Sequence, residues 1–246
     1  AKAMRIDFGR LVIGDTAKKY LQRAIDKNWV SEGDNVREFE EKFAAQFGYK
    51  HAIAVSSGTD ADICSCASLY DFGAQRGDEI IVPALSFVST ANSILAAGFV
   101  PKFVDIEVET LNLDPSKVEE AITDKTIAVM AVHTMGKPCE MESIMKTAKT
   151  YNLRVIEDAC EAHGAAYKGR VVGTIGDFGT FSFYVAHLIV CGEGGMVVTN
   201  KDDLARVVRS VRTHGRPTGS NYFDFQRIGF NSRMNDLEAA LGLESL

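Results

Sequence analysis

The feature that most constrains the fold of this chain is the alternation of short apolar runs with longer amphipathic stretches. Seven runs of five or six residues are almost wholly apolar, and helix-like patterns separate most of them. Strands that are apolar on both faces and are separated by helices are typical of a mostly parallel sheet with helices on both sides. The expected strands span residues 52–57, 79–84, 102–106, 127–132, 153–158, 178–183 and 195–200.

The stretches between these strands have the apolar spacing of amphipathic helices. Strand 195–200 follows strand 178–183 through a loop without a clear helix, which favours an antiparallel direction for it. The pattern predicts an α/β fold with one large domain over residues 31–246, preceded by an N-terminal segment over residues 1–30. The expected helices span residues 16–27, 36–48, 59–72, 89–98, 114–122, 140–152, 201–215 and 234–246.

Composition excludes several classes of function. The formal net charge of the 246 residues is −6, which argues against a protein that binds nucleic acid through a basic face. No apolar run approaches the roughly 20 residues of a membrane span. Five cysteines without a CxxC pattern indicate reduced thiols in a cytoplasmic protein rather than disulfides or a metal site. We therefore expect a cytoplasmic protein that binds no metal, nucleic acid or membrane.

Polar residues just after the expected strands are the candidates for a ligand site, since open α/β sheets bind ligands at the carboxyl ends of their strands. After strand 52–57, the glycine turn "SSGTDA" opens a helix. The backbone amides of Gly58 and Thr59 suit a phosphate, although a plain helix N-cap at Ser57 or Thr59 explains the same residues. After strand 79–84, Phe87 precedes a helix, where it can stack on a flat cofactor ring or belong to the core.

Four further candidates follow the fifth and sixth strands. Asp158 suits the partner of a protonated pyridine nitrogen, as in pyridoxal-phosphate enzymes, or a helix N-cap. His163 either orients Asp158 or is a core histidine with its hydrogen bonds satisfied, and we favour the core histidine. Ser182 has a hydroxyl that can reach the same phosphate as Gly58. His187, five residues later, is the only group between Thr180 and Asn200 that can act as a base near neutral pH.

Six motifs in order resemble one family. "SSGT", "PALSFVSTAN", "VIEDACEAHGA", "FGTFSFYVAH", "GEGGMVVT" and "GFNSRMNDLEAALG" closely resemble the DegT/DnrJ/StrS-type nucleotide-sugar aminotransferases, from about Ile13 to Leu246. The resemblance implies the aspartate-aminotransferase fold (fold type I), with a mostly parallel seven-stranded sheet between helices. It also implies a smaller C-terminal domain that this chain lacks, in keeping with a chain that stops inside an expected helix.

The resemblance implies a role for several strand-end residues. The amides of Gly58 and Thr59 and the hydroxyl of Ser182 would bind the phosphate of pyridoxal phosphate or pyridoxamine phosphate. Phe87 takes the position that stacks on the ring, and Asp158 the position of the partner of the ring nitrogen.

Two other positions carry a role from the family. Glu161 falls where the family usually has a glutamine near the ring hydroxyl. Asn231 would reach a phosphate bound by the neighbouring subunit, because active sites in this family lie across a homodimer interface. The expected partners are therefore a nucleotide sugar and a second copy of the chain.

His187 stands where most members of the family have the lysine that binds the cofactor covalently. An imidazole cannot hold the cofactor that way, but it can move protons. The exchange resembles the branch of 3-dehydratases that act on nucleotide-linked 4-keto-6-deoxyhexoses, with pyridoxamine phosphate held non-covalently and His187 as the base. Only Cys191 lies beyond Cys160, which favours members that regenerate the cofactor from glutamate over those with an iron–sulfur partner.

Two other functions remain open from the sequence. One is a sugar aminotransferase that acts on a 4-keto or 3-keto sugar and has an altered lysine position. The other is a non-catalytic relative that binds the cofactor or a nucleotide sugar.

Overall fold

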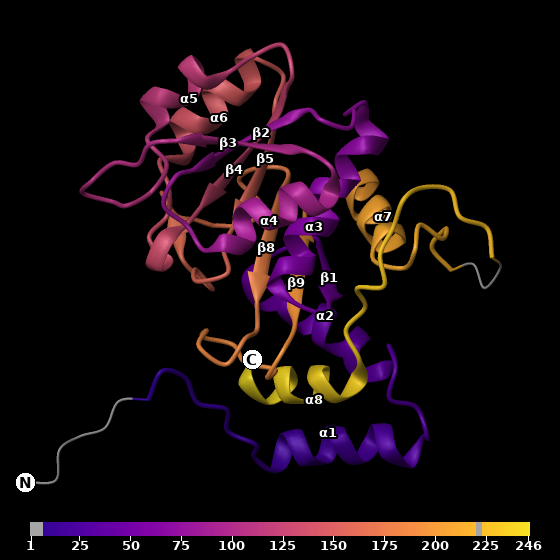
Figure 1. The fold of residues 1–246 in the computed structure, drawn as a ribbon. Coiled ribbons are helices and arrows are strands. Elements are labelled where there is room, and N and C mark those ends of the chain that lie inside the picture. The colour runs from indigo at the N-terminus through magenta and orange to yellow at the C-terminus, as the bar shows by residue number, and fades with distance from the viewer. Residues whose placement is uncertain (1–6, 220–222) are drawn as a thin grey trace, which may run out of the picture.

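A seven-stranded sheet forms the centre of the molecule (Figure 1). The computed structural model describes residues 7–219 and 223–246. The strands lie in the order β1-β9-β8-β5-β4-β2-β3, and β9 alone among them runs antiparallel to its two neighbours, β1 and β8. The expected mostly parallel sheet and the antiparallel last strand are thus confirmed. The strands are β1 (His51–Val55), β2 (Glu79–Pro83), β3 (Val100–Val104), β4 (Thr126–Val132), β5 (Arg154–Asp158), β8 (Phe178–Ser182) and β9 (Gly195–Thr199).

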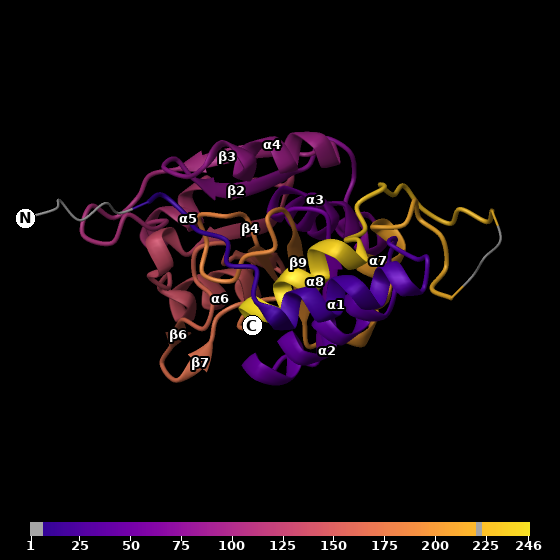
Figure 2. The ribbon, with the colours of Figure 1, turned by 90° about the horizontal axis from the view of Figure 1, so that it is seen from below.

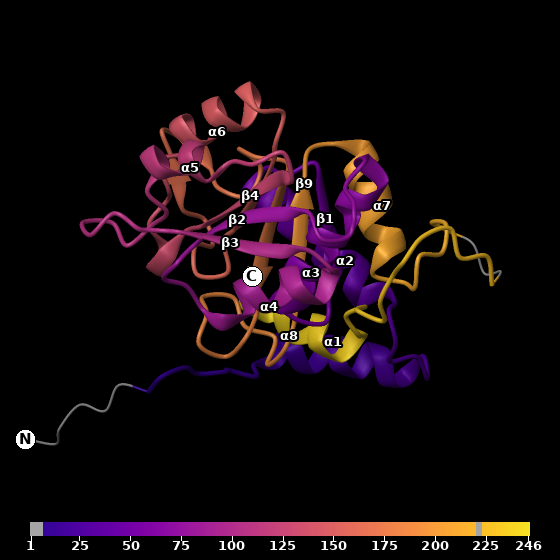
Figure 3. The ribbon, with the colours of Figure 1, turned by 45° about the horizontal axis from the view of Figure 1, so that its top comes forward.

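Eight α-helices are described around the sheet, each within a few residues of its expected range. Their apolar faces meet alternate residues of the strands, so that Ile53 and Ala54 belong to different core clusters on opposite faces of the sheet. Helices α3, α4 and α7 cover one face, and α2, α5, α6 and α8 cover the other (Figure 3). The helices are α1 (Asp15–Asp26), α2 (Asp34–Phe47), α3 (Gly58–Ser68), α4 (Val88–Ala97), α5 (Pro115–Ala121), α6 (Met141–Thr150), α7 (Asp202–Val211) and α8 (Asp236–Ser245).

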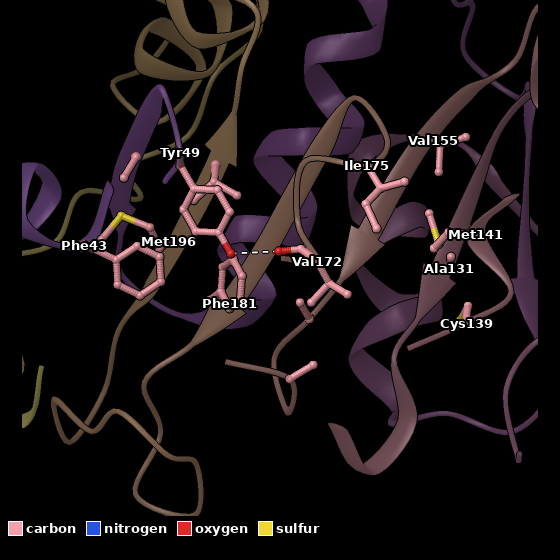
Figure 4. Packing of buried hydrophobic residues seen from close by; sticks show 14 of the residues in the cluster. Phe43, Tyr49, Ala131, Cys139, Met141, Val155, Val172, Ile175, Phe181 and Met196 are labelled. Carbon is pink, nitrogen blue, oxygen red and sulfur yellow. Dashed lines mark hydrogen bonds between the residues drawn. The ribbon is translucent and has the colours of Figure 1, made fainter. Parts of the chain in front are cut away.

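A cluster of aromatic rings fills the core under α2. The ring of Phe43 lies 5.3 Å from that of Phe181 and 5.7 Å from that of Phe183, with edge-to-face geometry. The hydroxyl of Tyr49 donates a hydrogen bond of 2.7 Å to the carbonyl of Val172 (Figure 4). This rigid packing fixes the end of β8, from which the loop with His187 begins.

Helices α1 and α8 lie side by side although they come from opposite ends of the sequence (Figure 2). The amide of Ala17 donates to Glu244 Oε2 at 2.6 Å. The side chain of Asn35 donates to the carbonyl of Asp236, and the amide of Val36 donates to Asp236 Oδ1. The first two helices are therefore tied to the last one by polar contacts as well as by apolar packing.

Some local features differ from the expected ones. The helix expected over 59–72 ends at Ser68 and continues as the 3₁₀ helix η1 (Leu69–Phe72), and α7 ends at Val211 rather than residue 215. A small hairpin of β6 (Ala166–Tyr167) and β7 (Arg170–Val171), not expected from the sequence, follows β5. Strands of two residues carry too little periodicity to be detected. Within the described residues, no helix is long and apolar enough to cross a membrane.

Candidate active site

A pocket of about 610 Å³ opens where the parallel strands end. Residues that follow β1, β2, β4, β5 and β8 line it, as expected for an open α/β sheet. Of the predicted site residues, Asn231 and the candidate His163 do not line this pocket. The lining residues are Phe8, Ser57, Gly58, Thr59, Ser86, Phe87, Ser89, Val132, His133, Thr134, Asp158, Cys160, Glu161, Ser182, Tyr184, Ala186, His187 and Glu193.

One wall of the pocket is the N-terminus of α3. Ser57 caps this helix by accepting a hydrogen bond from the amide of Asp60 at 3.0 Å. The capping interpretation is therefore correct for Ser57, yet it leaves the amides of Gly58 and Thr59 without a partner among the described residues. Two free amides at the positive end of a helix dipole form an anion site.

Gly58 allows this wall to approach Ser182. A Cβ atom at Gly58 would lie 2.5 Å from Ser182 Cβ and 3.2 Å from Cys160 Sγ. Any larger residue would push the helix away from β8 and separate the Gly58 amide from the Ser182 hydroxyl. The close packing thus brings three donors, from the amides of Gly58 and Thr59 and from Ser182, to one side of the pocket.

Asp158 lies at the floor of the pocket, at the end of β5, and is only 6% exposed. Its Oδ1 accepts a hydrogen bond from the amide of Cys160 at 3.1 Å. No α-helix follows, so the alternative of a helix N-cap is wrong for this residue. Burial raises the pKa of Asp158, and no described residue forms an ion pair with it. A cation placed in the pocket would therefore stabilise its ionised form.

Phe87 and Glu161 are exposed residues of the pocket lining. Phe87 is 76% exposed, which contradicts the alternative that it belongs to the core, and its ring is free to stack on a ligand. Glu161 is exposed, and its Oε2 accepts a hydrogen bond of 2.7 Å from the amide of Met135. Met135 has a positive φ of 53°, so this bond fixes a turn in a conformation that few side chains favour.

His187 lies in the loop after β8 and is half-buried. Its amide donates a hydrogen bond to the carbonyl of Tyr184 at 2.9 Å. Burial lowers the pKa of the imidazole, and the carboxylates of Glu161 and Asp158 oppose that change. None of the described residues that line the pocket is a lysine. The imidazole is thus a neutral base, in a place where the pocket offers no amine.

The preferred interpretation of His163 as a core histidine is confirmed for its packing and wrong for its hydrogen bonds. Both ring nitrogens of His163 are buried and lack a hydrogen-bond partner among the described residues. The ring packs against those of Phe181, Phe183 and His187, with centroids 5.3, 5.9 and 6.4 Å away. Burial, together with the neighbouring His187, lowers the pKa of His163 to about 4. His163 is therefore a neutral aromatic neighbour of the catalytic candidate and not a residue with its hydrogen bonds satisfied.

Asn231 does not contribute to the pocket of its own chain. It is exposed and pairs with Thr213 in an isolated antiparallel bridge. Its neighbour Ser232 donates to Asp60 Oδ1 at 3.0 Å, behind the N-terminus of α3.

The sequence interpretation missed His133, which follows β4 and lines the pocket. Its Nδ1 accepts from the amide of Cys139 at 3.0 Å, so its Nε2 must carry the hydrogen that is shared with Glu157 Oε1 at 3.1 Å. Glu157 also accepts from the amides of Gly173 and Gly176. The position of His133 directly after a predicted strand is the signal that could have identified it.

The pocket has the donors and charges that a cofactor with a phosphate group and a cationic ring needs. Two unpartnered helix amides and a serine hydroxyl face one end, and an unpaired buried carboxyl faces the other. Within residues 7–219 and 223–246, no group of three His, Cys, Asp or Glu side chains is placed to hold a metal ion. The residues present therefore fit pyridoxal phosphate or pyridoxamine phosphate.

Comparison with known families agrees with the fold and the pocket. Residues 12–246 match the model of the DegT/DnrJ/EryC1/StrS aminotransferase family, so the chain belongs to that family. The fold and the position of the pocket define the class as an α/β protein of the fold-type-I aminotransferase kind.

Particular relatives carry different functional names. The chain is 44% identical over 230 residues to the GDP-perosamine synthase of Caulobacter vibrioides, and this match covers 93% of the chain and 61% of that protein. It is 36% identical over 245 residues to the GDP-4-keto-6-deoxy-D-mannose 3-dehydratase of Yersinia pseudotuberculosis, and this match covers 92% of the chain and 62% of that protein. The chain thus spans about three fifths of the length of these two relatives.

A solved structure shows the same architecture. The Escherichia coli GDP-4-keto-6-deoxy-D-mannose-3-dehydratase with bound hydrated PLP superposes with a TM-score of 0.89 at 32% identity, over 98% of this chain and 67% of that one.

Proposed function

We propose that this protein uses pyridoxal or pyridoxamine phosphate to remove the 3-hydroxyl of a nucleotide-linked 4-keto-6-deoxyhexose as water. The observation that carries this proposal is His187, a half-buried imidazole in a pocket whose described lining contains no lysine. An aminotransferase usually holds its cofactor through a lysine amine, whereas the elimination of the 3-hydroxyl needs only a base beside the bound cofactor.

The pocket residues have separate tasks in this proposal. The amides of Gly58 and Thr59 and the hydroxyl of Ser182 hold the phosphate, and Phe87 covers one face of the ring. Asp158 keeps the ring nitrogen protonated through its carboxylate. When bound, the cofactor supplies an amine that condenses with the sugar ketone and a ring that withdraws electrons.

His187 would move the proton on which the elimination depends. Because its pKa is lowered by burial, the ring is neutral at cellular pH and ready to accept a proton at a ring nitrogen. Glu161 would lie near the ring hydroxyl of the cofactor and keeps a negative charge near the imidazole.

The partners in this proposal come from relatives. A solved relative is described as a variant of GDP-4-keto-6-deoxymannose-3-dehydratase with bound GDP-perosamine, which supports a nucleotide sugar as the substrate class. Another is described with a trapped PLP-glutamate geminal diamine, which supports glutamate as the amino donor. We also propose a homodimer in which Asn231 reaches the phosphate site of the partner, and a cytoplasmic location, since the five cysteines are unpaired.

A sugar aminotransferase is the second candidate. Its support is the 44% identity to GDP-perosamine synthase, which exceeds the 36% identity to the dehydratase of Yersinia pseudotuberculosis. The candidates differ in what they do to the substrate. The dehydratase replaces the 3-hydroxyl by hydrogen and releases the cofactor nitrogen as ammonia, whereas transamination leaves that nitrogen on the sugar as an amino group.

Mass spectrometry of the products separates them. The protein is mixed with pyridoxamine phosphate, glutamate and a panel of nucleotide-linked 4-keto-6-deoxyhexoses. A sugar product that is lighter by one oxygen atom, formed together with ammonia, supports the dehydratase. His187→Asn should lower that rate by about 10²- to 10⁴-fold, the usual contribution of a general base. The matched control is His51→Asn, at an exposed pair with Asp202 far from the pocket. An aminated sugar, formed by the wild type and not affected by His187→Asn, would refute the proposal.

A further inference from the structure

Asp62 is a buried carboxyl to which the proposed function gives no task. It lies one turn after Gly58 in α3 and is 1% exposed. Its Oδ1 lies 2.7 Å from Thr180 Oγ1 of β8, and its Oδ2 is buried without a hydrogen-bond partner among the described residues. An ionised carboxyl in such a place is costly, because nothing replaces the water that it loses.

Thr180 connects Asp62 to Asp158, which lies at the floor of the pocket. Thr180 is the register partner of Asp158 between β8 and β5, and its carbonyl accepts from the amide of Ala159 at 2.9 Å. Burial and then the neighbouring Asp158 raise the pKa of Asp62, and burial also raises that of Asp158. Two buried carboxyls this close cannot both be ionised, so they share at least one proton.

The hydrogen bonds indicate which carboxyl keeps that proton. Asp158 accepts from the amide of Cys160, which stabilises its ionised form. Asp62 has only the hydroxyl of Thr180, which also lies 3.4 Å from the carbonyl of Glu157. A protonated Asp62 would donate to Thr180 Oγ1 and free the Thr180 hydroxyl to donate to Glu157. The acid hydrogen of Asp62 and the hydroxyl hydrogen of Thr180 would then each have an acceptor.

Asp60, two residues earlier in the same helix, is the contrast. Its carboxylate accepts from the hydroxyls of Ser56, Ser57 and Ser232, at 2.5, 3.0 and 3.0 Å. Three hydroxyl donors thus replace the water that this carboxylate loses on folding.

We propose that Asp62 is a positioning residue that holds a proton beside Asp158, so that the pair carries one negative charge and Asp158 keeps it. The charge then faces the pocket, where only an ionised Asp158 can pair with a cationic ring nitrogen. This use of the charge rests on the proposed function, whereas the protonation of Asp62 rests on the hydrogen bonds above.

Few other titratable groups face Asp62. They are Asp158 of β5, the thiol of Cys160 in the loop after it, and the thiol of Cys66 on α3 itself. Burial raises the pKa of both thiols, which therefore stay neutral. The strands β8 and β9 and the helix α4, which pack against α3, carry no ionisable side chain. Helix α7, η1 and β1 also pack against α3 and carry ionisable side chains, but none of these acts on the pKa of Asp62; they are Asp202, Asp203, Arg206, Arg209, Tyr70, Asp71 and His51.

Infrared spectroscopy of the protein without cofactor tests the proton. At pH 7, the difference between wild type and Asp62→Asn should show the carbonyl band of a protonated carboxyl, with a shift in D₂O. The matched control, Asp60→Asn, should leave that band unchanged. In Asp158→Asn the band should disappear at a pH about one unit or more lower than in the wild type, because the neighbouring charge is gone.

Cofactor binding tests the role separately. Asp62→Asn mimics the neutral acid and should bind pyridoxamine phosphate within about twofold of the wild type, whereas Asp158→Asn should bind it at least tenfold more weakly. If Asp62→Asn does not fold, the same band is sought in wild-type protein that carries ¹³C-carboxyl aspartate, where Asp158→Asn and Asp60→Asn assign it.

Absence of the protonated band in the wild type would overturn the inference. So would a band that persists to the same pH in Asp158→Asn, since the two carboxyls would then be independent. A tenfold loss of pyridoxamine phosphate binding in Asp62→Asn would overturn the role of a neutral neighbour. A wild type that shows the band yet binds no pyridoxamine phosphate would refute the proposed function and leave the proton on Asp62 supported.

Discussion

Three functional residues of the pocket are fixed by local hydrogen bonds. The side chain of Asp158 accepts from the amide of Cys160 and that of Glu161 from the amide of Met135, while the backbone of His187 donates to Tyr184. The charges of these residues interact strongly with one another, because the protein partly encloses the pocket and reduces screening by water. The electrostatic state of one residue therefore depends on the identity of its neighbours.

Glu161→Gln tests this dependence through the pH profile. Burial holds the pKa of His187 below the usual value of about 6.5, and the negative charge of Glu161 partly compensates. Removing that charge lowers the pKa further, so the imidazole stays neutral to lower pH. The acid limb of the activity should move to lower pH, and NMR titration of the His187 ring should move the same way.

Glutamine keeps an oxygen that can accept from the Met135 amide, so the turn at Met135 should survive the change. Glu193→Gln is the control, since Glu193 also lines the pocket but is not among the groups that act on the pKa of His187. An acid limb that moves to higher pH in Glu161→Gln would contradict the expected sign.

At the scale of single elements, α3 is the helix on which the site depends most. It supplies the two free amides, its N-cap and the buried Asp62. It can do so only because Gly58 lets its first turn lie against Ser182.

Gly58→Ala should therefore weaken both the fold and the anion site. The added methyl would lie 2.5 Å from Ser182 Cβ, and overpacking of this kind costs about 1 to 3 kcal/mol. We expect a lower denaturation midpoint and weaker binding of pyridoxamine phosphate. Thr59→Ser, which keeps the amide and the hydroxyl, serves as the control. A variant that binds the cofactor as well as the wild type would show that the contact relaxes without cost.

Helix α8 depends on its N-cap residue in a different way. Asn235 accepts from the amides of Leu237 and Glu238, and Glu238 reaches back to the amide of Asn235. Replacing this capping box residue by alanine should cost about 1 kcal/mol of unfolding free energy. Asn235→Asp, which keeps the acceptor, should cost much less in the same chemical denaturation experiment. Equal losses in the two variants would exclude the cap as the cause.

The sequence predicted these elements better than it predicted their contacts. All seven strands of the main sheet and all eight helices follow from apolar periodicity, since each is long enough to show a period. The location of the pocket was predicted from the polar residues that follow each expected strand. The buried pair of Asp62 and Asp158 and the isolated nitrogens of His163 could not be predicted, because they depend on which side chains meet across separate elements.

At the scale of the whole molecule, a buried ionic cluster joins elements that are far apart in the sequence. Arg212, at the end of α7, pairs with Glu40 of α2 at 2.8 Å and with Glu32 at 2.5 Å, and it is 4% exposed. Glu40 also accepts from the amide of Ala54 in β1 at 2.8 Å. The cluster thus holds α2 and α7, which cover opposite faces of the sheet, to the edge strand between them.

Arg212→Leu should destabilise the protein by about 3 kcal/mol, because it removes the closer of the two arginines that pair with buried Glu40 and leaves that carboxylate to Arg209 alone. Chemical denaturation at pH 7 measures this loss. The control is Lys18→Ala, which breaks an exposed pair with Asp15 and should change the unfolding free energy by less than about 1 kcal/mol. Equal effects of the two substitutions would show that burial of the cluster adds nothing.

The pairing of β1 with β9 and of α1 with α8 also governs when the chain can fold during its synthesis. As an edge strand, β1 has β9 as its one sheet neighbour, and α1 meets α8 only after both have left the ribosome. Helix α1 and strand β1 therefore wait, with apolar surface uncovered, until β9 and α8 are made. Long-range closure of this kind slows folding and exposes nascent chains to aggregation. Chaperone binding to the nascent chain would thus be expected to persist until α8 is made.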